Sequence, residues 1–293
     1  HSDLKEHENE QGDDCVSCHM PKSGSTDIPH VTVTDHKIAI TQHMSLSESK
    51  SVKEFIGLYC VNNSSPSDLT ILRAYLQQYE KFEKEKYYLD SAFVYLSKIP
   101  LEMCTSEWIK FYFFSLDFNG LVNWFERASF ESRSDQLNKR SYTNDDAWSW
   151  YRVGESYYKT QNYEKASSCF EQASLLAPFH LEIQNKFGMA LLKCNRLKEA
   201  QKVFEFVCSE NPNFEKVYAN YGYLFSILGE FDQALLMYEK GIALNPDIVQ
   251  LWMNLAAYYL HFQNIESAQN SLSQVLRIKP NHKRAQQLLN QIK

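Results

Sequence analysis

The sequence has little positive charge, no long apolar run and no initiator methionine. Its 30 Lys and Arg residues stand against 36 Asp and Glu residues, which gives a net charge of −6. Binding to nucleic acid needs a basic surface that neutralises phosphates, so this balance argues against nucleic acid as a partner. No apolar run approaches the roughly 20 residues of a membrane-spanning helix. Because the chain begins at His1, we expect it to be part of a longer protein whose start, with any signal peptide, lies upstream.

The sequence also lacks a recognisable catalytic constellation. No Ser, His or Cys lies in a nucleophile-elbow or glycine-rich context. The adjacent carboxylates Asp145 and Asp146 are expected in a loop with no histidine beside them. No active site is therefore predicted, and any oxidoreductase activity is expected in the upstream part of the protein.

Five of the seven cysteines are spread through predicted helices, where a free cysteine usually packs as a small apolar side chain. We expect burial for Cys60, Cys104, Cys169, Cys194 and Cys208.

The chain does contain an internal repeat: between Ala147 and His282 one sequence pattern recurs four times with a period of 34 residues. The first column holds small residues, Gly154, Gly188, Gly222 and Ala256. A second holds Ala166, Ala200, Ala234 and Ala268, and a third holds Pro178, Pro212, Pro246 and Pro280. A fourth is apolar, with Phe170, Phe204, Tyr238 and Leu272. Small residues let two helices approach closely, and proline ends the second helix because it cannot donate a backbone hydrogen bond.

This period and its helix–turn–helix unit resemble the tetratricopeptide repeat (TPR). The resemblance implies an all-α fold, a right-handed solenoid of helical hairpins in which each hairpin supplies part of its neighbour's core. Residues 147–282 are then four repeats, and 283–293 form a capping helix with one apolar face. Two further columns are in register: Trp150, Gln184, Tyr218 and Trp252, and at the turn into the second helix Tyr163, Leu197, Phe231 and Ile265.

Residues 51–146 are predicted to form a divergent TPR-like helical region. A helix is expected from Val52 to Tyr59, and another after the capping pair Ser67–Asp68. An aromatic-rich hairpin is expected from Trp108 to Ala128, broken at Asn119–Gly120. We interpret its aromatic side chains as core.

Residues 1–14 are acidic and without apolar periodicity, which predicts a solvated linker. Cys15, Cys18 and His19 follow as C-x-x-C-H, the signature of c-type haem attachment. Two thiols can add to the two vinyl groups of haem, and the neighbouring imidazole can bind the iron.

The spacing of Cys15, Cys18, His30 and His36 also approaches that of a zinc site. The connection before His30 contains two prolines and no helical pattern, which argues against a zinc finger. A disulfide or a free dithiol is the third alternative.

The run CVSCHMPKSGSTDIPHVTVTDHKI resembles the last haem-binding segment of multihaem cytochromes c that carry C-terminal TPR repeats. The resemblance covers roughly the first 45 residues and the joining region that follows, and it implies a haem-binding segment over 15–50. It implies thioether bonds at Cys15 and Cys18, His19 as the proximal iron ligand and either His36 or His30 as the distal one. It further implies an electron-transfer protein in the periplasm or another extracytoplasmic compartment, with other haems upstream. The alternative is a TPR interaction scaffold whose C-x-x-C-H segment is apo or holds zinc.

The TPR resemblance also implies a concave groove, lined by the first helix of each hairpin, that binds a peptide or a protein segment, such as part of a redox partner. The implied groove residues are aromatic and polar, without the Arg or Lys clamp that would indicate a carboxylate or phosphate ligand. They are Trp148, Tyr151, Glu155, Tyr158, Asn185, Met189, Lys216, Ala219, Tyr223, Gln250, Met253 and Ala257.

Overall fold

The computed structural model of the chain describes residues 22–24, 32–34, 55, 57–58, 60, 64–127 and 144–292. It divides into two compact units, residues 1–56 and 57–293. In the first unit, β1 (Lys22–Gly24) and β2 (Thr32–Thr34) pair antiparallel, with Lys22 opposite Thr34. The segment expected to be irregular therefore contains a short two-stranded ribbon. The predicted haem ligands lie outside the described residues: Cys15, Cys18, His19, His30 and His36.

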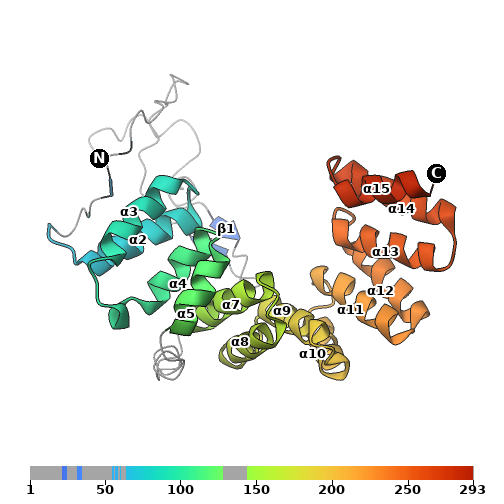
Figure 1. The fold of residues 1–293 in the computed structure, drawn as a ribbon, viewed down its shortest axis with the longest axis horizontal. Helices are drawn as coiled ribbons and strands as arrows, with labels where there is room; N and C mark the ends of the chain where they lie inside the picture. The colour runs from blue at the N-terminus through green and yellow to red at the C-terminus, as the bar shows by residue number, and fades with distance from the viewer. Residues whose placement is uncertain are drawn as a thin grey trace, which may run out of the picture. The chain divides into compact units, whose positions relative to one another are not determined.

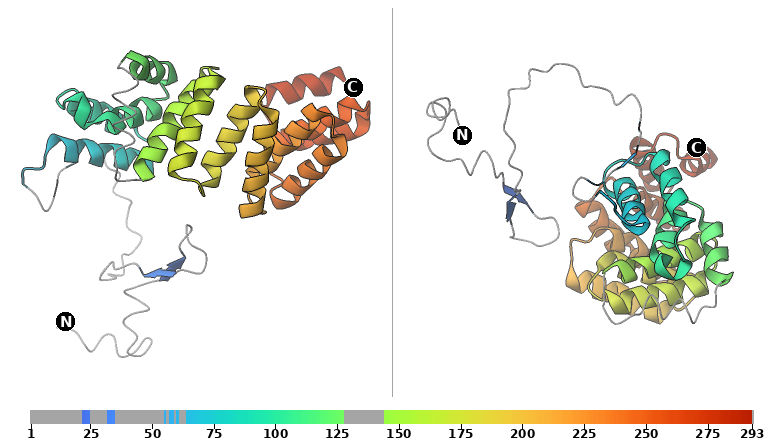
Figure 2. Two further views of the ribbon diagram at one scale, coloured as in Figure 1. Left: turned by 90° about the horizontal axis from the view of Figure 1, so that it is seen from below. Right: turned by 90° about the vertical axis from the view of Figure 1, so that its left-hand side faces the viewer.

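The second unit is helical wherever the structure describes regular elements, and its helices pair as hairpins in chain order (Figures 1 and 2). The first part contains α2 (Asp68–Lys81), α3 (Lys86–Leu96), the 3-10 turn η1 (Leu101–Met103), α4 (Thr105–Phe114) and α5 (Phe118–Arg127). The repeats contain α7 (Asn144–Lys159), α8 (Tyr163–Leu176), α9 (Leu181–Lys193), α10 (Leu197–Glu210), α11 (Lys216–Leu228), α12 (Phe231–Leu244), α13 (Val249–His261) and α14 (Ile265–Ile278). The last helix is α15 (Lys283–Gln291), which packs on α14. None of the helices in the described ranges combines the length and apolar character needed to cross a lipid bilayer.

The helix expected from Val52 to Tyr59 is absent at the positions that the structure describes there. Phe55, Gly57 and Leu58 belong to no helix, and Gly57 has a φ of +140°, outside the helical range. The Leu58 amide instead donates a hydrogen bond to the hydroxyl of Tyr75 on α2, at 3.1 Å. Leu58 is thus tied to α2 without being part of a helix.

The aromatic-rich hairpin exists as α4 and α5, but its turn lies earlier than predicted. The turn is at residues 115–117, where Leu116 has a φ of +57°. Gly120 stands in the first turn of α5, and its amide donates to the Asp117 carboxylate at 2.8 Å. Asp117 therefore supplies the side-chain acceptor that starts α5, which allows Asn119 and Gly120 to be helical.

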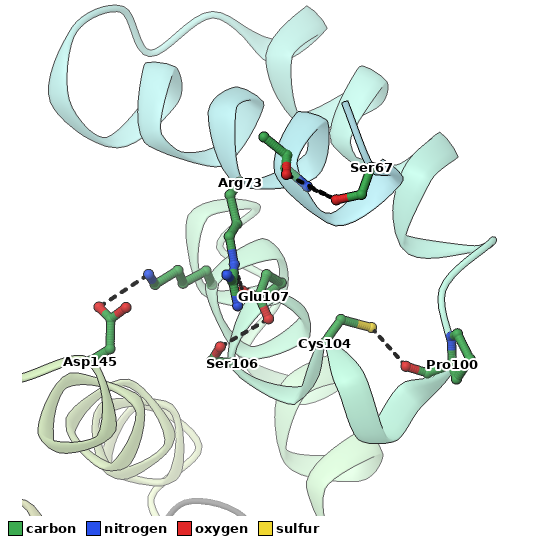
Figure 3. Close-up of polar contacts among 9 residues, drawn as sticks. Ser67, Arg73, Pro100, Cys104, Ser106, Glu107 and Asp145 are labelled. Carbon is green, nitrogen blue, oxygen red and sulfur yellow. Dashed lines mark hydrogen bonds and ion pairs between the residues drawn. The ribbon is translucent and has the colours of Figure 1, made fainter. Parts of the chain in front are cut away.

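A buried carboxylate ties α2 to α4 (Figure 3). Glu107 accepts from Arg73 Nε at 2.7 Å and from Ser106 Oγ at 2.9 Å. Lys110 then pairs with Asp145 at 3.3 Å, which links α4 to the start of α7. Asp145 and Asp146 therefore lie in the first turn of α7 and not in the predicted loop. In that turn their negative charges lie at the positive end of the helix dipole.

The cysteines divide by position. Cys104 and Cys169 are buried as expected, and burial raises the pKa of the Cys104 thiol to about 11. Cys194 and Cys208 are half-buried, whereas Cys60 is exposed and belongs to no helix. The expectation of burial was wrong for Cys60, which, like the described residues Phe55, Gly57 and Leu58 before it, belongs to no helix.

The two helices of a repeat hairpin approach each other closely where a glycine on the first helix faces an aromatic ring on the second. A methyl group added at Gly154 would lie 3.0 Å from the ring of Phe170. At Gly188 and Gly222 it would collide with Phe204 and Tyr238. All of these rings are buried, so the small-residue column and the aromatic column are two halves of one contact.

The turn inside each repeat hairpin has the same backbone geometry. Its left-handed residue recurs every 34 positions, at Gln161 (φ +64°), Asn195 (+60°), Gly229 (+77°) and Gln263 (+56°). The amide of the following residue bonds the carbonyl five positions earlier at 2.9 Å in all four turns, a Schellman-type helix end.

A second periodic contact joins one hairpin to the next. The side chain six residues after each proline of the 34-residue column donates to that proline's carbonyl oxygen. The pairs are Gln184–Pro178 at 2.8 Å, Tyr218–Pro212 at 2.6 Å, Trp252–Pro246 at 2.7 Å and Gln286–Pro280 at 2.9 Å. These bonds explain why Gln184, Tyr218 and Trp252 occupy equivalent positions of the repeat: each of these different side chains supplies a hydrogen-bond donor.

The left-handed turn positions give opposite expectations for two substitutions. Gln263→Gly should stabilise the protein by about 0.5–1 kcal/mol, because only glycine adopts this φ without steric cost. Gly229→Ala should destabilise it by about 1 kcal/mol although a methyl group there meets nothing within 4 Å. Chemical denaturation of both variants measures the difference. Equal effects of the same sign would contradict the role given to these left-handed positions.

Candidate protein-docking face

The first helices of the four repeats present equivalent side chains along one surface. α9 contacts α11, and α11 contacts α13. We call this surface the first-helix face, formed by Trp148, Glu182, Lys216 and Gln250; Tyr151, Asn185, Ala219 and Met253; Arg152, Lys186, Asn220 and Asn254; Glu155, Met189, Tyr223 and Ala257; and Tyr158. Each group of four recurs at 34-residue intervals.

Ion pairs join consecutive first helices. Lys186 on α9 lies 2.9 Å from Glu155 on α7, and Lys216 on α11 lies 2.9 Å from Glu182 on α9. The Glu155–Lys186 pair is largely shielded, with side chains only 9% and 19% exposed. Partial burial strengthens the attraction but makes either charge costly if its partner is removed.

Amide contacts continue the same connections toward the C-terminal end. Asn220 Nδ2 donates to Asn185 Oδ1 at 3.0 Å, which joins α11 to α9. Asn254 Nδ2 donates to the Ala219 carbonyl at 2.9 Å, which joins α13 to α11. Gln250 in turn donates to Asn254 Oδ1 at 2.6 Å. Polar side chains thus hold the four first helices in register.

The structure assigns the twelve predicted groove residues to two roles. Glu155, Asn185 and Ala219 are buried, so they support the face from within and are not available to a partner. The other nine are half-buried or exposed, with Tyr223 the most prominent large side chain at 43% exposure. They are Trp148, Tyr151, Tyr158, Met189, Lys216, Tyr223, Gln250, Met253 and Ala257.

Aromatic side chains dominate the α7 end of the face. The Trp148 ring packs edge-on against Tyr151 and His180, with centroids 5.1 and 4.8 Å apart. Tyr158 contacts Tyr163 at 5.2 Å. Burial, followed by the neighbouring Tyr163 and Glu155, raises the pKa of Tyr158 to about 12, so this hydroxyl stays a hydrogen-bond donor at neutral pH.

Arg152 lies at the junction between the face and the preceding hairpins. Its side chain is 7% exposed, and one guanidinium nitrogen donates to Glu80 on α2 at 2.7 Å. The guanidinium also lies over the rings of Phe114 and Trp148, 5.5 and 6.0 Å from their centroids. Burial lowers the pKa of Arg152, and the carboxylate of Glu80 opposes that shift.

The column Arg152, Lys186, Asn220 and Asn254 was missed by the sequence reasoning, although its 34-residue period was a usable signal. All four side chains bond to a neighbouring helix. The basic residues of the face, Arg152, Lys186 and Lys216, each have a carboxylate partner. The face therefore offers aromatic, aliphatic and amide groups to a ligand in place of a free cationic clamp.

A separate, open cavity of about 400 Å³ lies at the α7–α8 turn. It is lined by Thr160, Gln161, Asn162, Tyr163, Glu164, Lys193 and Cys194. Burial and the nearby Glu164 raise the pKa of Cys194 to about 11, which disfavours a reactive thiolate. Within the described ranges, no group of three or more His, Cys, Asp or Glu side chains is arranged to hold a metal ion.

The hairpins and the first-helix face together define a helical-repeat module of the protein-interaction class. Two parts of this module are tetratricopeptide repeats. Residues 147–180 and 227–292 each match a family model described as tetratricopeptide repeat. The prediction of TPR repeats is therefore confirmed.

Similar proteins share parts of the chain. A BBSome complex member BBS4 homolog of Drosophila melanogaster is 26% identical over 133 residues, 45% of this chain and 27% of that protein. The human protein O-mannosyl-transferase TMTC3 is 26% identical over 157 residues, 48% of this chain and 17% of that protein. The chain thus spans about a quarter or less of these relatives.

Among solved structures, the pilF protein of Pseudomonas aeruginosa superposes with a TM-score of 0.52 at 17% identity. The superposition covers 76% of this chain and 99% of that one. This likeness concerns the fold.

The Glu155–Lys186 pair should show strong coupling in a double-mutant cycle. Glu155→Gln leaves Lys186 without its carboxylate, and Lys186→Met leaves Glu155 only its longer contact with the more exposed Lys159, at 3.7 Å. Each substitution should destabilise the protein by about 1–3 kcal/mol. The double variant should lose less than the sum of the two. Denaturant unfolding measures all three variants. The matched cycle at the exposed pair Arg277–Asp247 should give no measurable coupling, and additivity at Glu155–Lys186 would refute the proposed linkage.

Proposed function

We propose that the first-helix face docks a segment of a partner protein, and that the same polypeptide carries a c-type haem in residues 15–50. The observation that carries the docking proposal is the polar network between consecutive first helices. It fixes the backbone beneath Trp148, Met189 and Tyr223 before any partner arrives. A surface ordered in advance loses little conformational freedom on binding, which favours affinity.

The chemistry of the face favours a partner segment with apolar or aromatic anchors. Its cationic groups are already paired with carboxylates, so an acidic tail gains little there. Half-exposed aromatic and methionine side chains, by contrast, can bury an anchor residue, and such anchors contribute most of the binding energy at protein interfaces. The Lys193 ammonium lies 6.0 Å from the Tyr223 ring centroid and adds a polar edge to this region.

Selection of a displayed random-peptide library on the full chain provides the test. Peptides enriched on the parent protein should bind Trp148→Ala/Tyr223→Ala at least about tenfold more weakly, as expected when two aromatic anchors are truncated. Fluorescence polarisation measures the affinities. The control Leu175→Ala removes a side chain that is 68% exposed on the second helix α8 and should bind like the parent. Enriched peptides that bind all three proteins equally would reject this face as the docking site.

The donor set Cys15, Cys18 and His19 suits covalent haem attachment, because two thiols and one imidazole follow within one turn of chain. When bound, haem supplies one-electron transfer. Either His36 or His30 would supply the second iron ligand.

In this proposal the protein acts outside the cytoplasm, where haem is attached. The repeats then hold a redox partner on the polypeptide that carries the haem, and electron transfer takes place between the docked pair. The scaffold with an apo or zinc-bound segment is the competing proposal.

Reduced pyridine haemochrome spectra test the haem proposal on protein co-expressed with cytochrome c maturation machinery. The parent should show a c-type band that Cys15→Ala/Cys18→Ala abolishes. His36→Ala and His30→Ala are compared: removal of the second iron ligand should convert the haem from low-spin to high-spin, and the other substitution should leave it low-spin. The absence of a band with one equivalent of zinc bound would support the metal-pinned scaffold instead. The absence of both would leave the docking module alone.

A further inference from the structure

The last two repeats expose apolar side chains at their turns. Ile227 and Leu228 at the end of α11 are 43% and 38% exposed, and Phe262 and Ile265 at the α13–α14 turn are 50% and 42% exposed. Half-buried Phe231 and Tyr258 both contact Phe262. We call these six residues the turn-edge patch.

At the positions of Ile227, Leu228 and Phe262, the first two repeats show that apolar character is not needed for folding. The position of Ile227 is occupied by Lys159 and Lys193 in the first two repeats. The position shared by Leu228 and Phe262 is occupied there by Thr160 and Cys194. All four turns have the same left-handed residue and the same closing hydrogen bond. Exposed apolar side chains in only two of four equivalent turns therefore call for a reason other than packing.

Ring contacts fix the patch across two hairpins. Phe262 lies 5.1 Å from Phe231 and 5.0 Å from Tyr258 between ring centroids. His261 stacks on Phe231 at 4.6 Å, so α13 of one hairpin is tied to the start of α12 in the other. The result is one continuous aromatic surface that is ordered without a partner.

The chain segments that carry the patch are acidic. Residues 227–239 and 258–266 contain Glu230, Asp232, Glu239 and Glu266, all exposed, and no Lys or Arg. None of these carboxylates forms an ion pair with a basic side chain in the part of the chain that the structure describes. Burial first, and then the charge of Asp232, raise the pKa of Tyr258, in keeping with carboxylates close to the rings.

We infer that the turn-edge patch is a second docking surface, for a basic amphipathic segment of another protein. Apolar side chains of that segment would cover Ile227, Leu228 and Phe262, and its Lys or Arg residues would pair with the acidic rim. Opposite charges around an apolar centre set the orientation of such a segment and raise the rate of encounter. This inference does not depend on the first-helix face.

The probe is a fluorescent Leu/Lys amphipathic peptide of about 18 residues, long enough to form a helix. The full chain should bind it, and a Leu/Glu peptide with the same apolar face should bind at least about tenfold more weakly because of the acidic rim. Ile227→Lys/Leu228→Thr, which installs the first repeat's own residues, should weaken Leu/Lys binding by about tenfold or more. Phe262→Thr, a second variant of the same design, should do so too.

Two control variants test whether peptide binding is confined to the turn-edge patch. Phe179→Thr removes a side chain that is 72% exposed outside the patch and should leave binding unchanged. Trp148→Ala on the first-helix face should also leave peptide binding unchanged. The two docking proposals can therefore fail independently of each other. Circular dichroism verifies that the variants are folded.

Equal binding of the Leu/Lys and Leu/Glu peptides, or equal binding by the parent and both patch variants, would overturn the inference. Sedimentation of the parent tests a second copy of this chain as the occupant. A concentration-dependent dimer that the patch variants abolish, and that the Leu/Lys peptide does not displace, would assign the patch to self-association and overturn the inference as well.

Discussion

The packing of the repeats depends on one contact, between a small residue on the first helix of a hairpin and a large side chain on the second. This contact limits the size of the residue on the first helix. Gly188 and Gly222 accept Phe204 and Tyr238 where a methyl group could not fit, and in the last hairpin Ala256 and the smaller Leu272 share the space. A larger first residue would push the two helices apart, and the surface they share with the next hairpin would change with them. The first-helix face inherits its spacing from this contact.

The same limit extends from one hairpin to the next. A methyl group at Gly241 on α12 would lie 2.8 Å from Leu251 on α13 and 2.9 Å from Tyr218 on α11. The close approach of consecutive hairpins brings each donor side chain within hydrogen-bonding distance of the proline carbonyl six residues earlier in the chain. Gln, Tyr and Trp all make that bond, so the column preserves a hydrogen-bond donor at a fixed place and not a residue type.

The period predicted the repeats because a column of small residues and a column of rings are visible in one sequence. The role of Glu155 and Asn185 was not visible, since their partners Lys186 and Asn220 lie 31 and 35 residues away. Local patterns also failed where a single side chain decided the outcome. Asp117 starts α5 ahead of Asn119–Gly120, and the Leu58 amide, in no helix, bonds the hydroxyl of Tyr75. The haem segment, with its ligands outside the described residues, stays a prediction.

The bonds to the proline carbonyls have a mechanical consequence. Each one spans the linker between two hairpins, from the residue that ends one unit to a side chain on the next. A linker bridged in this way cannot act as a free joint, so tension along the chain is shared by neighbouring hairpins instead of being absorbed at one hinge. The repeats should therefore respond to pulling as an elastic spring, with small strains distributed over every unit and recovered when the load is released.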